Sequence, residues 1–414
     1  MKIYKRWRKK SIHTSLEMRR VILLSGPRQC GKTTLSRSLN VEGSIYRTLD
    51  DKELLNSAIE DPQGFVDHKN TLMIIDEIQK TPELLSAIKK DVDENQTYGR
   101  FLLTGSANIR SLPNVKESLA GRVHNIRLRT LGLGEIYGTP PLFLKNAFEE
   151  KFFPHKSPNS YKKNDYIELA LKGGYPEALR LESLRSRQSW HKDYINSLIE
   201  RDLKDIINIR RKDSMHKLLG CLAAWSSKFM DLAQIGSGLS ITRPTLESYV
   251  NALETLYLTE RLNPWTKTDY DRVARKDKFF MSDTGLMSSI LNWSLEKVQF
   301  NGDANGKLIE TFVFNQLSTI IDAQEEDYEI YHYRDRLKRE IDFLIQNEDG
   351  DYLGIEVKAG TNVNMSSFQH LQWFKNNMLG STKFVGVVLY AGENILRFGE
   401  RMWAVPISAL WGGS

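Results

Sequence analysis

The chain has 414 residues, of which 40% are hydrophobic and 27% are charged, with 58 Lys and Arg against 52 Asp and Glu for a net charge of +6. These values exclude a largely disordered chain, and the length allows two or three domains with cores of their own. Two cysteines exclude a disulfide framework or a zinc cluster, and no apolar run approaches the roughly 20 residues of a membrane helix, so we expect a cytoplasmic protein that does not enter a membrane.

The N-terminal segment, residues 1–17, is strongly basic. No apolar stretch follows its charges, which excludes a secretory signal. The charges permit contact with DNA or RNA phosphates without requiring it, and a solvated tail explains them better than a phosphate-binding arm. We therefore predict a basic, solvated tail at residues 1–17.

A glycine-rich stretch begins directly after the first apolar run, residues 21–24. Gly26, Gly31, Lys32 and Thr33 have the spacing G-x-x-x-x-G-K-[ST] of a P-loop. In such a loop the backbone N–H groups surround phosphate oxygens, the lysine reaches the β and γ phosphates, and the threonine hydroxyl ligates Mg²⁺. The sequence therefore predicts a site for ATP with Mg²⁺, and its nucleotide-binding residues are Gly26, Pro27, Arg28, Gln29, Cys30, Gly31, Lys32, Thr33 and Thr34.

A second apolar strand, residues 72–75, runs straight into Asp76 and Glu77. This is a Walker B pattern, in which Asp76 holds Mg²⁺ directly or through water and Glu77 orients and polarises the attacking water. A solvated pair of carboxylates at the end of a strand is the alternative. After a P-loop at this distance, we predict Asp76 as a nucleotide and metal ligand and Glu77 as a catalytic residue.

A third strand, residues 100–104, is followed by polar residues. Polar groups at the end of a buried parallel strand lie beside the γ-phosphate in such sheets, so Thr104, Ser106 or Asn108 could sense it. We include Asn108 among the nucleotide-binding residues. An ordinary turn at the end of a strand explains this segment almost as well.

These motifs resemble the AAA-type ATPases of bacteria and archaea that carry a C-terminal domain of unknown function after the ATPase module. The resemblance covers most of the chain, and it includes residues 119–122 (Leu-Ala-Gly-Arg), 173–177 (Gly-Gly-Tyr-Pro-Glu), 282–286 (Ser-Asp-Thr-Gly-Leu), 340–343 (Glu-Ile-Asp-Phe) and 355–358 (Ile-Glu-Val-Lys). In that family an arginine at the place of Arg122 approaches the nucleotide from the same or a neighbouring subunit. The resemblance therefore implies that Arg122 is an arginine finger, in a homo-oligomer if it acts between subunits, and a simple ion pair is the alternative.

The predicted fold class is α/β. We expect a P-loop NTPase domain with a parallel sheet and flanking helices at 18–140 and a linker at 141–165. A helical and winged-helix region follows at 166–276, and a mixed α/β domain at 277–414. The winged-helix interpretation rests on helices at 231–234 and 242–256 and a wing strand at 258–262. Its second helix offers only Arg243 to read bases, so a structural or protein-contact role is favoured over DNA binding.

The C-terminal domain contains acids at regular positions of a predicted hairpin, with Asp342 on the first strand and Glu356 and Lys358 on one face of the second. Glu310 lies among apolar residues of a predicted helix at 306–314. This pattern resembles the restriction-endonuclease-like superfamily. The resemblance implies that Asp342 and Glu356, helped by Glu310, hold Mg²⁺ or Mn²⁺ while Lys358 positions the attacking water. A domain that keeps this fold only for contacts, or a buried ion pair, is the alternative.

The function predicted from these sites is Mg²⁺-dependent ATP hydrolysis coupled to an action on DNA or RNA, with a nuclease-like C-terminal domain. The alternative is a regulatory switch, in which slow nucleotide turnover controls assembly and the C-terminal domain only binds a protein or nucleic-acid partner.

Overall fold

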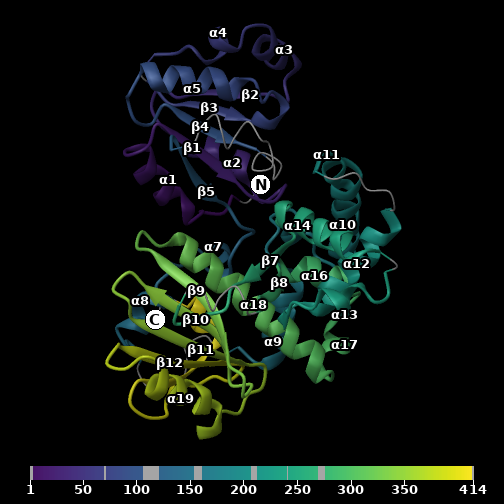
Figure 1. Ribbon diagram of the computed structural model, residues 1–414, viewed down its shortest axis with the longest axis vertical. Helices are drawn as coiled ribbons and strands as arrows, with labels where there is room; N and C mark the ends of the chain where they lie inside the picture. Colours follow the sequence, from purple (N-terminus) through teal and green to yellow (C-terminus); the bar gives the residue numbers. More distant parts are fainter. Residues whose placement is uncertain are drawn as a thin grey trace.

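The computed structural model describes residues 3–69, 71–105, 121–152, 161–206, 212–239, 241–268 and 276–412. These residues form an N-terminal sheet domain, a largely helical middle region and a C-terminal sheet domain (Figure 1). In the view of Figure 1 the N-terminal domain lies at the top, the middle region at the right and the C-terminal domain at the lower left.

The N-terminal domain contains a parallel five-stranded sheet of strand order β2-β3-β4-β1-β5, as predicted. The strands are β1 (Val21–Ser25), β2 (Ile45–Thr48), β3 (Met73–Asp76), β4 (Phe101–Thr104) and β5 (Val123–Arg127). Helices α1 (Arg8–Leu16) and α2 (Lys32–Arg37) pack on one face, and α3 (Lys52–Glu60), α4 (Pro62–Val66) and α5 (Leu84–Glu94) on the other. Both faces of the sheet are covered, and β1, β3 and β4 are accordingly apolar up to their last residues, Ser25, Asp76 and Thr104, which lie at one edge of the sheet.

The basic N-terminal segment is not a solvated tail, and that prediction is wrong. The Arg6 guanidinium is buried and donates to Glu135 Oε1 at 3.0 Å and to the backbone oxygen of Cys30 at 2.9 Å. The Trp7 indole donates to the Thr139 oxygen at 2.9 Å. Arg6 and Trp7 therefore pack against the sheet domain, and these contacts outweigh the solvation of the arginine charge.

The middle region surrounds a small antiparallel sheet of strand order β6-β8-β7. Among the described residues from α12 to β8, the order of elements is helix, strand, helix, helix, strand, strand. The elements are α9 (Lys163–Lys172), η3 (Ala178–Arg180), α10 (Leu184–Ser197), η4 (Leu198–Asp202), α11 (Leu203–Ile206), α12 (Lys212–Trp225), β6 (Lys228–Phe229), α13 (Leu232–Gly236), α14 (Arg243–Thr255), β7 (Thr259–Leu262), β8 (Lys278–Met281), α16 (Thr284–Ile290) and α17 (Leu295–Gln299).

Strand β8 lies between two cores, which places the border of the C-terminal domain later than residue 277. Phe279 and Met281 pack into the core of the middle region, whereas Phe280 packs with Phe314 and Phe343 of the C-terminal core. Neighbouring residues of a strand point to opposite faces, so one short strand serves both cores.

The segment expected to be a linker, 141–165, also packs. Within it α8 (Phe143–Phe148) forms a helix whose Phe143, Leu144 and Phe148 are buried in the C-terminal core. Residues 153–160 lie outside the described part of the chain.

The C-terminal domain is a mixed sheet of strand order β13-β14-β12-β11-β10-β9 with helices on both faces. The predicted hairpin is confirmed, since β10 and β11 are antiparallel with Phe343 opposite Ile355. The elements are α18 (Gly302–Ala323), β9 (Tyr328–Arg334), β10 (Glu340–Asn347), β11 (Tyr352–Lys358), η5 (Met365–Phe368), α19 (Gln369–Met378), β12 (Phe384–Tyr390), β13 (Leu396–Arg397), β14 (Met402–Pro406) and η6 (Ile407–Leu410).

A largely buried ionic cluster joins the three parts. Glu260 of β7 accepts hydrogen bonds from Arg127 Nη2 at 2.7 Å and from Arg129 Nη1 at 2.6 Å. Arg129 also contacts Asp322 of α18 at 2.7 Å. Burial alone would raise the pKa of Glu260, but the two arginines outweigh burial and lower the pKa to about 2.

We expect the Glu260→Gln substitution to destabilise the protein by roughly 3–5 kcal/mol near pH 7, because it leaves buried arginines without their carboxylate. A depressed folded pKa contributes stability that is present above the ordinary glutamate pKa and is lost as the pH falls towards the folded value of about 2. The difference between wild type and variant should therefore shrink below about pH 4.5. Urea denaturation as a function of pH measures the loss of stability and its dependence on pH. The control is Glu247→Gln, in an exposed pair with Arg243, which should lower the free energy of unfolding by under about 0.5 kcal/mol.

Candidate nucleotide site and carboxylate cluster

The P-loop connects β1 to α2 and depends on two glycines. Gly26 has φ +150°, and a Cβ there would lie 2.2 Å from the backbone oxygen of Leu128. Gly31 has φ +102°, a left-handed conformation that side chains rarely adopt. The loop therefore requires glycine at both positions, for close backbone approach at the first and for backbone conformation at the second.

The Lys32 ammonium lies over this loop. Its Nζ donates to the backbone oxygens of Gly26 at 3.0 Å and Pro27 at 2.8 Å, and the side chain is buried. The positive charge thus lies at the N-terminus of α2, inside the loop that the sequence predicts to bind phosphates.

Asp76 is surrounded by hydroxyl donors at the carboxyl edge of the sheet. Thr33 Oγ1 donates to Asp76 Oδ2 at 2.8 Å and Tyr46 OH to the same oxygen at 2.7 Å, while Thr104 donates to Oδ1. Burial and Asp76 together raise the pKa of Tyr46 to about 12, so this hydroxyl stays a donor. Because Thr33 and Asp76 are in direct contact, their oxygens fit the ligand set that Mg²⁺ requires beside a phosphate.

Glu77 follows Asp76 in a left-handed conformation with φ +60°. Its side chain lines the same cleft as Lys32 and Thr33, and the Gln79 amide donates to its carboxylate. This backbone conformation turns Glu77 out of the strand and towards the P-loop. Left-handed conformations of residues other than glycine are strained and occur often at functional sites.

The cleft over the P-loop has a volume of about 640 Å³, and its second wall comes from the middle region. No motif in the sequence indicates this wall, which is formed by Pro176, Glu177, Arg180, Trp190, Tyr194, Ser197, Leu198 and Arg201. The rings of Trp190 and Tyr194 are stacked at 5.3 Å with an angle of 8°. Leu198 and Arg201 belong to η4, a single π-helical turn, and such turns often occur at functional sites.

Two contacts tie the P-loop to this wall. Arg28 Nη2 lies 2.6 Å from Asp202 Oδ1 of η4, and Tyr194 OH donates to the Arg28 backbone oxygen at 3.2 Å. Gly173, with φ +67°, lies against Asp283 and Gly285, and this close approach directs Pro176 and Glu177 to the cleft. The segments 173–177 and 282–286 therefore pack directly against each other.

Arg122 is not at the nucleotide site of its own chain. It precedes β5, whose first residue pairs with Val21 at the start of β1, so Arg122 lies at the sheet edge opposite the P-loop. Its guanidinium contacts Asp93 of α5 at 2.5 Å. In this structure Arg122 forms the ion pair that was the alternative to an arginine finger, and action at the nucleotide site of a neighbouring subunit remains a prediction. Asn108 and Ser106 lie outside the described residues.

The C-terminal acids converge as predicted, but around a lysine that the sequence analysis missed. Lys278 Nζ of β8 lies 2.6 Å from Glu310, 3.0 Å from Glu340 and 3.1 Å from Asp342, and its side chain is 2% exposed. Burial alone would lower the pKa of Lys278, but the carboxylates outweigh it and raise the pKa. On β11, Glu356 is buried and lies 3.4 Å from Lys358 Nζ.

These acids do not fit a divalent metal as they stand. The Lys278 ammonium occupies the space between the carboxylates, and among the described residues no group of three or more His, Cys, Asp or Glu could hold a metal ion. Burial raises the pKa of Glu310 to about 8, and burial with Asp342 raises that of Glu356 well above its ordinary value. The Lys278 ammonium thus balances part of the charge of the cluster, and the predicted metal ligands Glu310, Asp342 and Glu356 are not arranged as a metal centre.

Comparison with known families divides the chain in the same way. The AAA domain family matches residues 18–137. A domain of unknown function (DUF8612) matches residues 163–297, and another (DUF4143) matches residues 305–410. The chain carries an AAA-type P-loop ATPase domain followed by two domains of unknown function. The family border after residue 297 agrees with the packing of β8 and α16 in the middle region.

Relatives with the same span exist in mycobacteria. The uncharacterized proteins Rv2008c of Mycobacterium tuberculosis and Mb2031c of Mycobacterium bovis are each 25% identical over 387 residues, which is 93% of this chain and 80% of theirs. Among solved structures, the Walker-type ATPase PABY2304 of Pyrococcus abyssi aligns with a TM-score of 0.43 and 15% identity, covering 70% of this chain and 96% of that one. No helix in the described ranges is long and apolar enough to cross a membrane.

Proposed function

We propose that the protein binds ATP with Mg²⁺ and hydrolyses it in the cleft between the P-loop and the middle region. The observation that carries the proposal is the direct contact of Thr33 with Asp76 at 2.8 Å, beside Lys32 and Glu77. Thr33 and Asp76 would hold Mg²⁺, which neutralises phosphate charge when bound.

Side chains of the protein carry out the other steps, which are binding of the phosphates and orientation of the attacking water. Lys32 gives up its two backbone acceptors and binds the β and γ phosphates. Glu77, held by Gln79, orients water towards the γ-phosphate. From the second wall, Arg180 and Arg201 bring positive charge to the same cleft, and Arg201 has no carboxylate within ion-pair distance in the described part of the chain. ATP would thereby draw the middle region and the AAA domain together.

The nucleotide site is tested by Lys32→Ala. We expect ATP affinity to fall roughly 100-fold, because a charge-assisted hydrogen bond contributes about 1.5–3 kcal/mol. Calorimetry or a fluorescent ATP analogue measures the affinity, with the exposed Lys52→Ala in α3 as the matched control. Wild-type affinity in Lys32→Ala would show that the nucleotide binds elsewhere.

For Arg122 we propose a role between subunits of a homo-oligomer. Lys32→Ala and Arg122→Ala should each be inactive alone, and their mixture should recover part of the ATP hydrolysis, because a mixed pair contains one complete site. Phosphate release from the mixture measures this. A mixture as inactive as its components would show that Arg122 does not act in a neighbouring subunit.

A nucleotide-controlled switch is the second candidate, and the Arg28–Asp202 ion pair favours it. This pair at 2.6 Å links the P-loop directly to the middle region, so bound phosphate would compete for Arg28 and change the link. If the segment from α12 to β8 is a winged helix, the pairing of Arg243 with Glu247 at 3.0 Å supports a protein contact over base reading. ATP turnover stimulated by DNA or RNA would favour a nucleic-acid function, and turnover indifferent to both would favour the switch.

We do not extend the proposal to metal-dependent cleavage by the C-terminal domain. Asp342 and Glu356 would hold the metal and Lys358 would position the water, but Lys278 already occupies the cluster.

A further inference from the structure

Tyr46 reaches the predicted Mg²⁺ site from β2, which lies outside the P-loop. In the sheet it pairs with Ile74, two residues before Asp76 on the same face of β3, and its ring spans this offset. The hydroxyl donates to Asp76 Oδ2 at 2.7 Å, the same oxygen that accepts the Thr33 hydroxyl at 2.8 Å. Asp76 is therefore held from two sides, by the loop and by a neighbouring strand of the sheet.

The ring of Tyr46 is held in place by the helix that follows the P-loop. Arg37, the last residue of α2, lies over this ring with its guanidinium carbon 4.3 Å from the ring centroid. A cation over the face of an aromatic ring is attracted by the ring electrons. The ring also packs against the apolar residues between α2 and the sheet, so its hydroxyl stays directed at Asp76.

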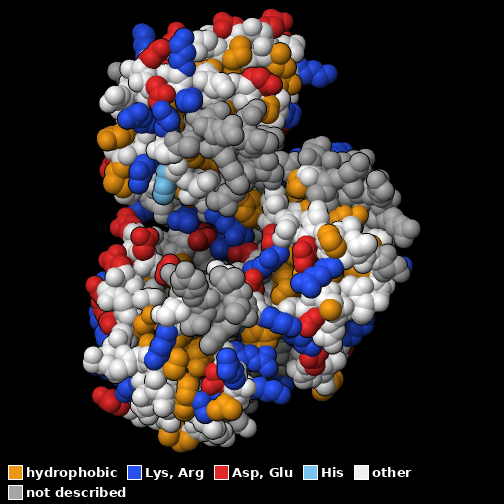
Figure 2. Space-filling view, in the orientation of Figure 1, with side chains coloured by type: hydrophobic (Ala, Val, Ile, Leu, Met, Phe, Trp, Pro, Cys, Tyr) orange, Lys and Arg blue, Asp and Glu red, His pale blue; other side chains and the backbone are white. Residues whose placement is uncertain are grey.

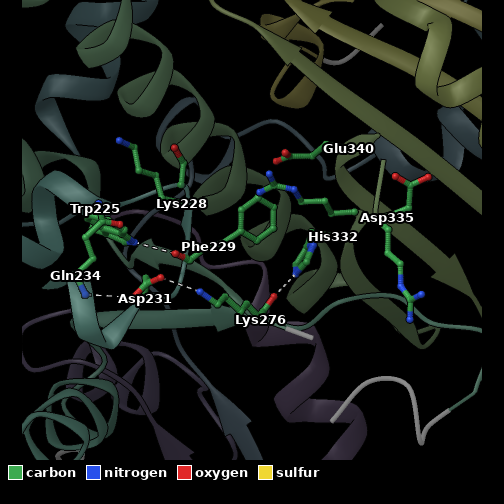
Figure 3. Close-up of a pocket in the computed structure, with 12 residues that line it drawn as sticks. Trp225, Lys228, Phe229, Asp231, Gln234, Lys276, His332, Asp335 and Glu340 are labelled. Atoms are coloured by element: carbon green, nitrogen blue, oxygen red, sulfur yellow. Dashed lines mark hydrogen bonds and ion pairs between the residues drawn. The ribbon is translucent and has the colours of Figure 1, made fainter. Parts of the chain in front are cut away.

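The partners of Asp76 are neutral, unlike those of many acids elsewhere in the molecule. Asp231 lies 2.8 Å from Lys276 in the cleft of about 930 Å³ between the small sheet of the middle region and strands β9 and β10 (Figure 3). Figure 2 shows Lys and Arg side chains beside Asp and Glu side chains where the parts of the molecule meet. At Asp76 the described partners are instead the hydroxyls of Thr33, Tyr46 and Thr104. Hydroxyl donors orient a carboxylate without cancelling its charge, so Asp76 can still attract a cation.

We propose that Tyr46 is a positioning residue for Mg²⁺ and that it acts through Asp76. Its hydroxyl holds Asp76 Oδ2, which accepts the Thr33 proton, so the lone pairs of the Thr33 oxygen are left for the metal. Partners of a metal ligand orient that ligand, and removing one typically weakens metal affinity about 10- to 100-fold. The inference rests on the proposed ATP site and gives a role there to a residue outside the nucleotide-binding motifs.

The test is Tyr46→Phe in the full chain, with the affinity for a fluorescent ATP analogue measured in EDTA and over a series of Mg²⁺ concentrations. In EDTA the variant should bind the analogue as wild type does, because the hydroxyl acts only through the metal ligand. The Mg²⁺ concentration that gives half of the metal-dependent gain in affinity should rise at least about tenfold. At saturating Mg²⁺ the variant should hydrolyse ATP at close to the wild-type rate, which distinguishes a weakened metal site from a damaged reaction.

Tyr98→Phe is the matched control, since Tyr98 is 61% exposed and precedes β4, at the edge of the sheet opposite the P-loop. It should keep the wild-type dependence on Mg²⁺. Because phenylalanine keeps the ring under Arg37, Tyr46→Phe should fold, and urea denaturation checks this. An unchanged dependence on Mg²⁺ in Tyr46→Phe, even with a lower unfolding midpoint, would show a structural role only and overturn the proposal.

The ATP site and the role of Tyr46 fail in different ways. A wild-type protein that binds no ATP analogue, in EDTA or in Mg²⁺, would overturn the ATP site and this inference with it. Wild-type binding that is equally tight with and without Mg²⁺, or hydrolysis lost in Tyr46→Phe at every Mg²⁺ concentration, would overturn the role of Tyr46 alone.

Discussion

Replacing Glu77 with glutamine is expected to lower the rate of ATP hydrolysis roughly 10²- to 10⁴-fold while ATP still binds, because a positioned general base contributes about that much. The glutamine keeps the size of the side chain and the left-handed turn at φ +60°, but it has no charge with which to polarise water. Phosphate release and ATP affinity, measured on the same preparation, separate the chemical step from binding.

The exposed Glu83→Gln at the start of α5 is the matched control and should hydrolyse ATP at the wild-type rate. If Glu77→Gln also kept that rate, another group would have to orient the water. Loss of both binding and hydrolysis would instead indicate that Glu77 supports the loop and not the reaction.

Replacing Lys278 with alanine should lower the free energy of unfolding by roughly 3–5 kcal/mol, because it leaves buried carboxylates without their cation. Glu310, Glu340 and Asp342 all lie within 3.1 Å of this ammonium and come from two different elements, so the loss affects the contact between the middle region and the C-terminal domain. Urea denaturation measures the effect. Lys375→Ala, in a partly exposed pair with Glu400, should cost at most about 1 kcal/mol.

The same variant tests whether the ammonium takes the place of a metal. With Lys278 gone, Mn²⁺ should raise the unfolding midpoint of the variant, since a ligand of the folded state stabilises it by mass action. Wild type should show no such increase from its carboxylate cluster. Stabilisation of wild type by Mn²⁺ that Asp342→Asn removes would restore the metal centre that the sequence pattern predicts.

Local signals in the sequence predicted the parallel sheet of the N-terminal domain and the position of its glycine-rich loop. The spacing of Gly26, Gly31, Lys32 and Thr33 is read within one loop, and the apolar run before Asp76 is typical of a buried parallel strand. Likewise, period-two alternation and the short turn predicted the β10–β11 hairpin, and its register follows from the turn. Features set by neighbours along the chain can be predicted from a single sequence.

Charge is where the prediction failed, because the partner of a buried charge lies far away in sequence. The pattern around Asp342 and Glu356 indicates converging acids, yet Lys278, 64 residues before Asp342, decides what neutralises them. Arg6 and Trp7 have the composition of a solvated tail, but Glu135 and Thr139 bind them.

By itself, then, the sequence determined that a phosphate-binding loop follows a buried strand, that Asp76 and Glu77 end another, and that acids converge in the C-terminal domain. Tertiary structure alone decided which groups face them. In the folded chain Arg201 and Tyr194 lie over the P-loop, Arg122 lies at the opposite edge of the sheet, and Lys278 lies among the C-terminal acids. The physical reason is that a strand or loop forms from local geometry, whereas a buried charge must find its partner wherever packing between separate elements provides one.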